Sequence, residues 1–150
     1  MSMYKHILIP TDGSETAEKA VEAGIEFARE SRARVTWFTA VPEYQLPSQA
    51  AIMSHQHVVS PDEHASRSRQ IADALFARLS ERAKKAGVEC DTDFTHSDHP
   101  YQAIIEAAKR NGCDLIFMAS HGRTGLSALV HGSETAGVLT HSSIPTLVYR

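Results

Sequence analysis

The sequence predicts an α/β fold, in which a single domain is built on an open, doubly wound sheet of five parallel strands with helices on both faces. Five short apolar segments are separated by segments whose apolar residues recur every three or four positions, so strands and helices alternate along the chain. Such alternation favours right-handed crossover connections and a parallel sheet. The chain has 150 residues, the size of one ordinary domain, and shows no internal repeat. We therefore interpret residues 1–150 as a single domain.

The five apolar segments predict the strands. They lie at residues 7–10, 34–41, 88–95, 115–119 and 145–149. Continuous apolar segments such as 115–119 are typical of strands buried on both faces. The segment 88–95 alternates instead, with Val88, Cys90 and Phe94 on one side and acidic residues on the other. This alternation predicts a more exposed strand at an edge of the sheet.

Four segments with helical spacing lie between or after the strands. They start at Ser14, residue 71, His99 and Gly132–Ser133, and they end near residues 28, 87, 111 and 141. Ser14 is a candidate N-cap, and Glu15 would interact favourably with the positive end of the first helix. Gly87 suits the residue that follows a helix. Pro145 prevents the last helix from continuing.

Residues 42–63 interrupt the alternation of strands and helices. This segment contains Pro42, Pro47 and Pro61 and has no sustained period, apart from a possible helical turn at residues 50–53. Loops of this length in compact domains are usually mobile lids, partner surfaces or inserted turns. Because the segment follows the second strand, we expect it at the carboxyl edge of the sheet.

The composition limits the cellular setting and the partners. The net charge is −3, from 15 basic and 18 acidic residues, which argues against nucleic-acid binding and against a polybasic membrane patch. No apolar run reaches the roughly 18 residues of a membrane helix, and the N-terminus lacks the architecture of a signal peptide. Cys90 and Cys113 are far apart and form no CxxC pair. We therefore expect a cytoplasmic protein with two free thiols.

Two segments at the carboxyl ends of predicted strands contain candidate binding residues. Pro10, Thr11 and Asp12 follow the first strand, and the Asp12 carboxylate can accept hydrogen bonds from a ribose or a base. A simple Asp-Gly turn that caps the helix explains the same residues equally well. Ala40 ends the second strand and lies at the same edge of the sheet.

The segment from Ser120 to Ser133 follows the fourth strand and is rich in glycine. Gly122, Gly125 and Gly132 precede Ser133 at a predicted helix start, and Arg123 supplies a cation. Glycines let backbone amides approach an anion, and a helix N-terminus attracts negative charge. The pattern is a weak signal on its own. The chain has no GxxxxGK[ST] phosphate loop, no GxGxxG after the first strand and no GxSxG nucleophile elbow.

Taken together, these motifs resemble the universal stress protein family over essentially the whole chain. The matching segments are Asp12-Gly13-Ser14-Glu15-Thr16-Ala17, Met118-Ala119-Ser120-His121-Gly122-Arg123, Gly132-Ser133-Glu134 and Ile144-Pro145-Thr146-Leu147-Val148-Tyr149. The resemblance implies the Rossmann-like fold shared with adenine nucleotide alpha hydrolases. It also implies ATP binding with Mg²⁺ on the phosphates, and a homodimer joined through the last strand.

The resemblance also implies which residues meet the nucleotide. Adenosine would contact Pro10, Thr11, Asp12, Ala40, Met118 and Ala119. Gly122, Arg123, Gly132, Ser133 and Glu134 would lie at the phosphates, where most contacts come from backbone amides. The family motif has a glycine where this chain has Ala119. Alanine is tolerated there if φ is negative and strained if φ is positive.

Two alternatives to an ATP-binding module remain open. One is a nucleotide-free dimer that acts through protein contacts, which Ala119 and the long segment after Val41 suggest. The other is an enzyme in which Asp12, Ser120 and His121 form an active group. No convincing general base or phosphate-loop lysine is present, so we expect at most slow ATP hydrolysis. The chain has nine histidines, and we interpret those in or beside loops, at 55, 57, 64, 96 and 99, as solvated side chains rather than metal ligands, because no cysteine is near them. His121 lies in the proposed site, where it either orients the loop or faces solvent.

Overall fold

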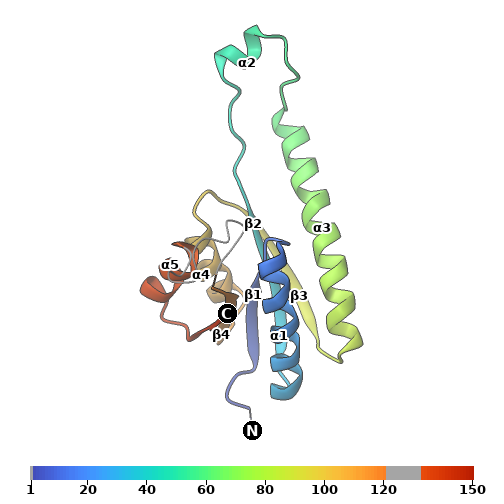
Figure 1. Cartoon of the computed structure of the whole chain (residues 1–150), viewed down its shortest axis with the longest axis vertical. Helices are drawn as coiled ribbons and strands as arrows, with labels where there is room; N and C mark the ends of the chain where they lie inside the picture. The colour runs from blue at the N-terminus through green and yellow to red at the C-terminus, as the bar shows by residue number, and fades with distance from the viewer. Residues whose placement is uncertain (1, 121–132) are drawn as a thin grey trace.

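The computed structural model describes residues 2–120 and 133–150, which form a five-stranded parallel sheet (Figure 1). The strands are β1 (His6–Pro10), β2 (Arg34–Val41), β3 (Cys90–His96), β4 (Leu115–Ala119) and β5 (Thr146–Tyr149). Their order is β3-β2-β1-β4-β5, so the chain winds away from β1 in both directions. The predicted open, doubly wound α/β fold is therefore confirmed. Such winding creates a switch point at the carboxyl ends of β1 and β4.

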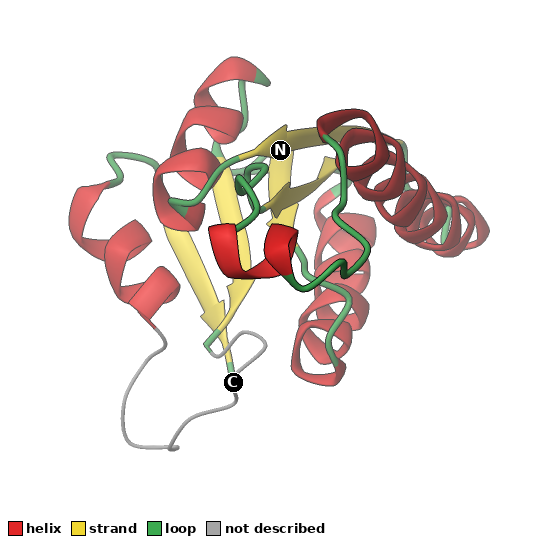
Figure 2. Cartoon of the chain, turned by 90° about the horizontal axis from the view of Figure 1, so that it is seen from above, coloured by secondary structure: helices red, strands yellow, loops and turns green. Residues whose placement is uncertain are grey.

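Helices cover both faces of the sheet, as Figure 2 shows. On one face α1 (Glu15–Ser31) and α3 (Pro61–Lys85) bury Ile7, Ile9 and Trp37. On the other face α4 (Pro100–Arg110) and α5 (Ser133–His141) bury Leu8 and Phe38. Successive residues of β1 thus enter opposite cores, as the period of two in a strand requires. This two-sided burial explains why the segment is continuously apolar.

The helix α3 begins at Pro61, well before the predicted start near residue 71. The Ser60 hydroxyl caps it by accepting a hydrogen bond from the Glu63 amide at 3.1 Å, and two acidic residues lie in its first turn. The prediction missed this start because the first two turns contain no fully buried residue and show no apolar period. The predicted loop at 42–63 is therefore shorter, and it contains the short helix α2 (Gln49–Met53).

The strand β3 lies at the edge of the sheet, as its alternating pattern predicted, and it pairs only with β2 among the described strands. Two ion pairs fix its acidic side chains. Asp91 pairs with Arg34, and Asp93 accepts from Arg110 at 2.6 Å. Charged side chains on an edge strand discourage pairing with another chain. The opposite edge strand, β5, has no such charges between Thr146 and Tyr149.

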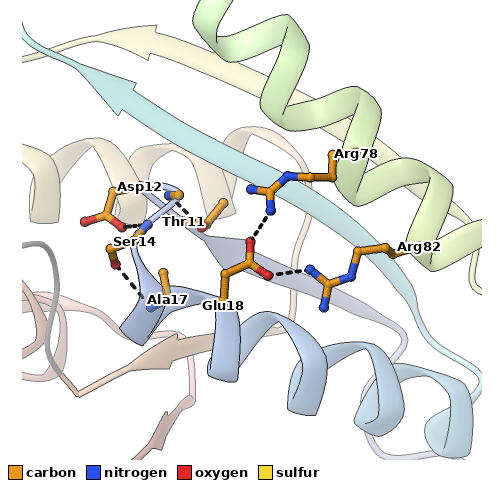
Figure 3. Close-up of polar contacts among 8 residues, drawn as sticks. Thr11, Asp12, Ser14, Ala17, Glu18, Arg78 and Arg82 are labelled. Atoms are coloured by element: carbon orange, nitrogen blue, oxygen red, sulfur yellow. Dashed lines mark hydrogen bonds and ion pairs between the residues drawn. The ribbon is translucent and has the colours of Figure 1, made fainter.

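An ion-pair cluster connects α1 with α3 on the first face (Figure 3). Glu18 lies 2.8 Å from Arg78 and 2.5 Å from Arg82, both on α3. All three side chains are partly exposed, so the cluster contributes no more than about 1 kcal/mol per pair. Most of the attachment of α3 therefore comes from its buried apolar residues Ala72, Phe76, Leu79 and Ala83.

The two cysteines are free thiols in different surroundings. Burial raises the pKa of the Cys113 thiol to about 12, whereas Cys90 lies half-buried on β3. The thiolate is the reactive form, so Cys113 stays protonated and unreactive at ordinary pH. We expect an alkylating reagent at pH 8 to modify Cys90 in the native protein and Cys113 only after unfolding. Peptide mass spectrometry measures this, and equal labelling rates in the native protein would contradict the account.

Over the residues that the structure describes, none of the helices is both long enough and apolar enough to cross a membrane.

Candidate functional site

The candidate site lies where three neighbouring strands end at the carboxyl edge of the sheet. The strand β1 lies between β2 and β4. Ala40 lies two residues beyond the β2 partner of Pro10, level with the turn after β1. Continuing the β1–β4 register places Met118 level with Pro10 and Ala119 level with Thr11. The fold therefore brings together all six residues that the sequence predicted around an adenosine.

The turn between β1 and α1 is held by side chains that accept amide hydrogen bonds (Figure 3). Asp12 Oδ1 accepts from the Ser14 amide at 2.9 Å, and Ser14 Oγ accepts from the Ala17 amide at 3.2 Å. Gly13 has a φ of 77°, which favours glycine. The predicted N-cap and the alternative Asp-Gly turn are thus both present. A carboxylate has about four acceptor positions, and the bond to Ser14 uses one of them.

Thr11 is buried and connects this turn to the sheet. Its amide donates to the Phe38 carbonyl of β2 at 2.9 Å, and its Oγ1 accepts from the Gly13 amide at 3.2 Å. Both polar groups of Thr11 therefore hold the backbone in place. This leaves Asp12 as the charged side chain that the turn presents at the carboxyl edge.

Ala119 ends β4 in an ordinary backbone conformation. Arg32 and His55 are the non-glycine residues with positive φ in the described part of the chain, so Ala119 has none of the strain that would require glycine. Its carbonyl accepts a hydrogen bond from Thr135 Oγ1 at 2.9 Å. The Ser120 amide donates to the Tyr149 carbonyl at 2.9 Å. The substitution of the family's glycine by alanine therefore adds one methyl group without straining the backbone.

Thr135 is a positioning residue that sequence reasoning missed. It is buried in the first turn of α5, and its hydroxyl also lies 3.3 Å from the Ser120 carbonyl. These contacts tie the N-terminus of α5 to the carboxyl end of β4. Threonine in a helix gives no sequence signal for such a contact, because it is common on solvent faces as well.

The start of α5 has the electrostatic features of an anion site with an added carboxylate. Ser133 is its first residue and is exposed, and the amides of the first turn carry partial positive charge. Glu134 follows, and its Oε2 atom is shielded from solvent with no hydrogen-bond partner among the described residues. A buried carboxylate oxygen without a partner is costly unless a ligand or cation satisfies it.

Several predicted phosphate contacts fall outside the described residues. They are Gly122, Arg123 and Gly132, together with the neighbouring His121 and Gly125. The described part of the candidate site therefore consists of the adenosine side and the first turn of α5.

The prediction that the loop histidines are solvated is wrong for His64 and His96. Both are partly buried, with their ring centroids 5.7 Å apart, and His64 also packs on Tyr44 at 5.7 Å. His64 Nε2 lies 3.0 Å from the Pro42 carbonyl, to which it donates. No group of three or more metal-ligating side chains occurs within residues 2–120 and 133–150. These rings instead pack the segment after β2 against α3 and β3.

A strand-order switch point, a capped turn with a carboxylate and a helix N-terminus place this chain in the class of doubly wound α/β proteins, which bind ligands outside the carboxyl ends of their strands. The universal stress protein family model matches residues 3–150, so the chain belongs to the universal stress protein family. The predicted family resemblance is confirmed.

Relatives of known structure agree with this assignment. Universal stress protein MJ0577 of Methanocaldococcus jannaschii is 30% identical, with 99% of this chain and 96% of the relative covered. Its solved structure superposes with a TM-score of 0.79 at 27% identity, covering 97% of this chain and 95% of that chain. A universal stress protein solved in complex with cAMP has a TM-score of 0.71 at 25% identity, with 99% of each chain covered.

Proposed function

We propose that this protein binds ATP at the carboxyl edge of β1, β2 and β4 as a cytoplasmic stress-response module. The observation that carries the proposal is the placement of Asp12, Ala40 and Ala119 around one switch point, with the N-terminus of α5 beside it. The relative solved with cAMP supports an adenine nucleotide as the ligand. The unstrained conformation of Ala119 removes the main objection from the sequence.

Each part of the site has a proposed role. The Asp12 carboxylate accepts hydrogen bonds from the ribose hydroxyls, and backbone groups of Ala40 contact the adenine. Met118 and Ala119 pack against the adenosine, and Pro10 and Thr11 hold the turn. The amides at Ser133 and those at Gly122, Arg123 and Gly132 receive the phosphates, because a helix N-terminus and glycine-rich backbone bind anions.

Glu134 gives Mg²⁺ a specific place in this proposal. Its unpaired Oε2 would repel a bare triphosphate at the start of α5. A hard divalent cation prefers carboxylate and phosphate oxygens, and Mg²⁺ usually binds proteins through one or two carboxylates together with substrate phosphates. Glu134 would therefore contact the Mg²⁺ that accompanies ATP. We expect little hydrolysis, because no side chain in the described part of the site is placed as a general base for water.

We also propose a homodimer formed through β5. This strand lies at the edge of the described sheet, carries no charged side chain between Thr146 and Tyr149, and leaves the Tyr149 ring partly exposed. An uncharged edge strand offers unpaired backbone groups to a second copy of itself.

Isothermal titration calorimetry with ATP and Mg²⁺ tests the proposed function. We expect saturable binding of one ATP per chain and much weaker binding of GTP. The matched variant Ala119→Gly should bind ATP within a few-fold of the natural protein, because Ala119 has no strained φ to relieve. Absence of binding at millimolar ATP would contradict the proposal.

The alternative, a nucleotide-free dimer acting through protein contacts, gives the opposite result in the same titration. In that case the natural protein does not bind ATP, and Ala119→Gly creates affinity by removing one methyl group from the site. The long segment after β2 favours this alternative as a contact surface, but such a surface is also compatible with ATP binding.

A further inference from the structure

The segment between β2 and the body of α3 projects beyond the sheet as an arm (Figure 1). We define the arm as residues 42–67, which end before Ser68, the first buried residue of α3. Its tip is α2, which buries none of its residues. Leu46, three residues before α2, is 86% exposed, and Ile52 and Met53 within α2 are 56% and 71% exposed. Large apolar side chains gathered on one projection mark an interaction surface.

The tip is also free of formal charge. Residues 44–60 contain no Asp, Glu, Lys or Arg, although charged residues make up 22% of the chain. A segment that stays exposed to solvent usually carries charged side chains, as the exposed face of α3 does. The composition therefore fits a segment that is covered by a partner.

The base of the arm is fixed to the body rather than loose. The Tyr44 hydroxyl donates to the Val59 carbonyl at 2.8 Å, which joins the two sides of the arm. The Glu43 amide donates to Asp98 at 3.0 Å, and His64 bonds Pro42. The apolar tip is thus presented in a defined position, which lowers the entropy cost of docking.

The exposed face of α3 next to the tip has charges that can pair with those of a second copy of the same face. Glu63, Arg67 and Ile71 recur every four residues and therefore share one face, and all three are exposed, with Ile71 at 61%. If two copies of α3 pack antiparallel on this face, Glu63 of each copy lies opposite Arg67 of the other. Glu63 also contacts His57 of its own arm at 3.0 Å, which leaves its second oxygen able to accept from an arginine.

This charge register also determines where the apolar residues meet. When Glu63 of one helix lies opposite Arg67 of the other, the two-fold axis passes beside residue 65 of both helices. Ile71 lies six residues from this axis, and Pro61, the start of the helix, lies four residues from it on the other side. At a rise of about 1.5 Å per residue, Ile71 then lies about 3 Å beyond the start of the second copy's helix. The arm tip, α2, lies beyond the N-terminal end of α3 (Figure 1). The same antiparallel arrangement therefore pairs Glu63 with Arg67 and brings Ile71 of each copy toward the arm tip of the other.

We propose that the arm is a second self-association surface, on which two copies pair antiparallel and each tip covers Ile71 of the other copy. A two-fold arrangement of this kind closes on itself and consumes both apolar tips. The arm lies away from β5, so the surface is independent of the dimer proposed above. With both surfaces in use, and with their two-fold axes perpendicular and intersecting, four copies form a closed assembly.

Sedimentation-velocity measurement of the native mass over a dilution series tests the proposal. Met53→Lys and Ile71→Lys should each reduce the assembly to the mass of the dimer formed through β5, because each places a charge in the apolar contact. E63R or R67E alone should do the same by opposing like charges, and the double variant E63R/R67E should restore the mass by reversing both sides of the pair.

The controls use residues of the same kind outside the arm. Met3→Lys adds the same charge at another exposed methionine, and E81R reverses an exposed glutamate near the other end of α3. Both should leave the mass unchanged, and circular dichroism should show that all variants are folded. An unchanged mass in the arm variants, or no rescue by E63R/R67E, would overturn the proposal. ATP titration of the same variants keeps this result separate from the proposed nucleotide binding.

Discussion

Asp12→Ala is expected to lower ATP affinity by about 10- to 100-fold, the largest effect of any single side chain in the site. Hydrogen bonds to a charged group contribute about 1.5–3 kcal/mol, and each 1.4 kcal/mol changes affinity tenfold. Asp12 also accepts from the Ser14 amide at 2.9 Å, so the alanine variant loses a turn contact as well. Calorimetric titration with ATP and Mg²⁺, together with thermal melting, measures both effects.

Asp12→Asn separates the two roles of this carboxylate. Asparagine keeps an acceptor oxygen for the Ser14 amide, so the turn and the thermal stability should be nearly retained. It loses the negative charge and replaces one oxygen by a donor, so ATP affinity should still fall. Unchanged ATP affinity in both variants would remove Asp12 from the site. A loss of affinity that only tracks a loss of stability would reduce its role to the turn.

Gly137→Ala is expected to destabilise the protein by about 1–3 kcal/mol, although alanine favours a helix over glycine by about 1 kcal/mol. An added Cβ would lie 2.4 Å from Tyr101 Cγ and 2.9 Å from Tyr101 Cβ. The Cβ of Tyr101 is fixed to the backbone of α4, so rotating the ring cannot relieve the clash. Thermal denaturation should show a melting temperature lower by roughly 3–10 °C.

A double-mutant cycle tests whether Tyr101 is the cause of this effect. Tyr101→Ala alone loses packing, including the stacking of its ring on His141 at 5.2 Å. Combined with Gly137→Ala, its cost should be smaller than the sum of the two single variants, because the clash is gone. A stabilised Gly137→Ala variant would show that helix propensity outweighs the contact between α4 and α5.

The sequence predicted the fold well because local and global signals agree in this chain. The edge position of β3, the burial of the continuous apolar segment in β4 and the Ser14 cap were all predicted from local physical chemistry, and each is present in the structure. The acidic residues that alternate with apolar ones in the segment 88–95 were sufficient to predict an edge strand. The sequence predicted a doubly wound sheet but not the order of its strands, because pairing between strands that are distant in the chain depends on the whole fold.

The sequence was less informative where tertiary contacts replace periodicity. The first turns of α3 carry a Ser60 cap, Pro61 and two acidic residues, which are genuine signals for a helix start. The lack of an apolar period there outweighed these signals in our prediction. The contacts of Thr135, His64 and His96 could not be predicted, because each joins segments that are far apart in the chain.

The sequence predicted which segments form the candidate site, but not the backbone conformation or the burial of the residues in it. Parallel strands place their carboxyl ends at one edge, so Asp12, Ala40 and Ala119 were expected to be neighbours. The sign of φ at Ala119 could not be predicted, since alanine adopts several backbone conformations. The unpaired carboxylate oxygen of Glu134 likewise depends on burial that only the folded chain defines.

A crystal structure of the protein grown with ATP and Mg²⁺ tests the central claim most directly. The account predicts adenosine against Asp12, Ala40 and Ala119, with the phosphates at the first turn of α5 and the metal near Glu134. Nucleotide bound elsewhere, or side chains of the protein filling this edge of the sheet so that no purine fits, would contradict it.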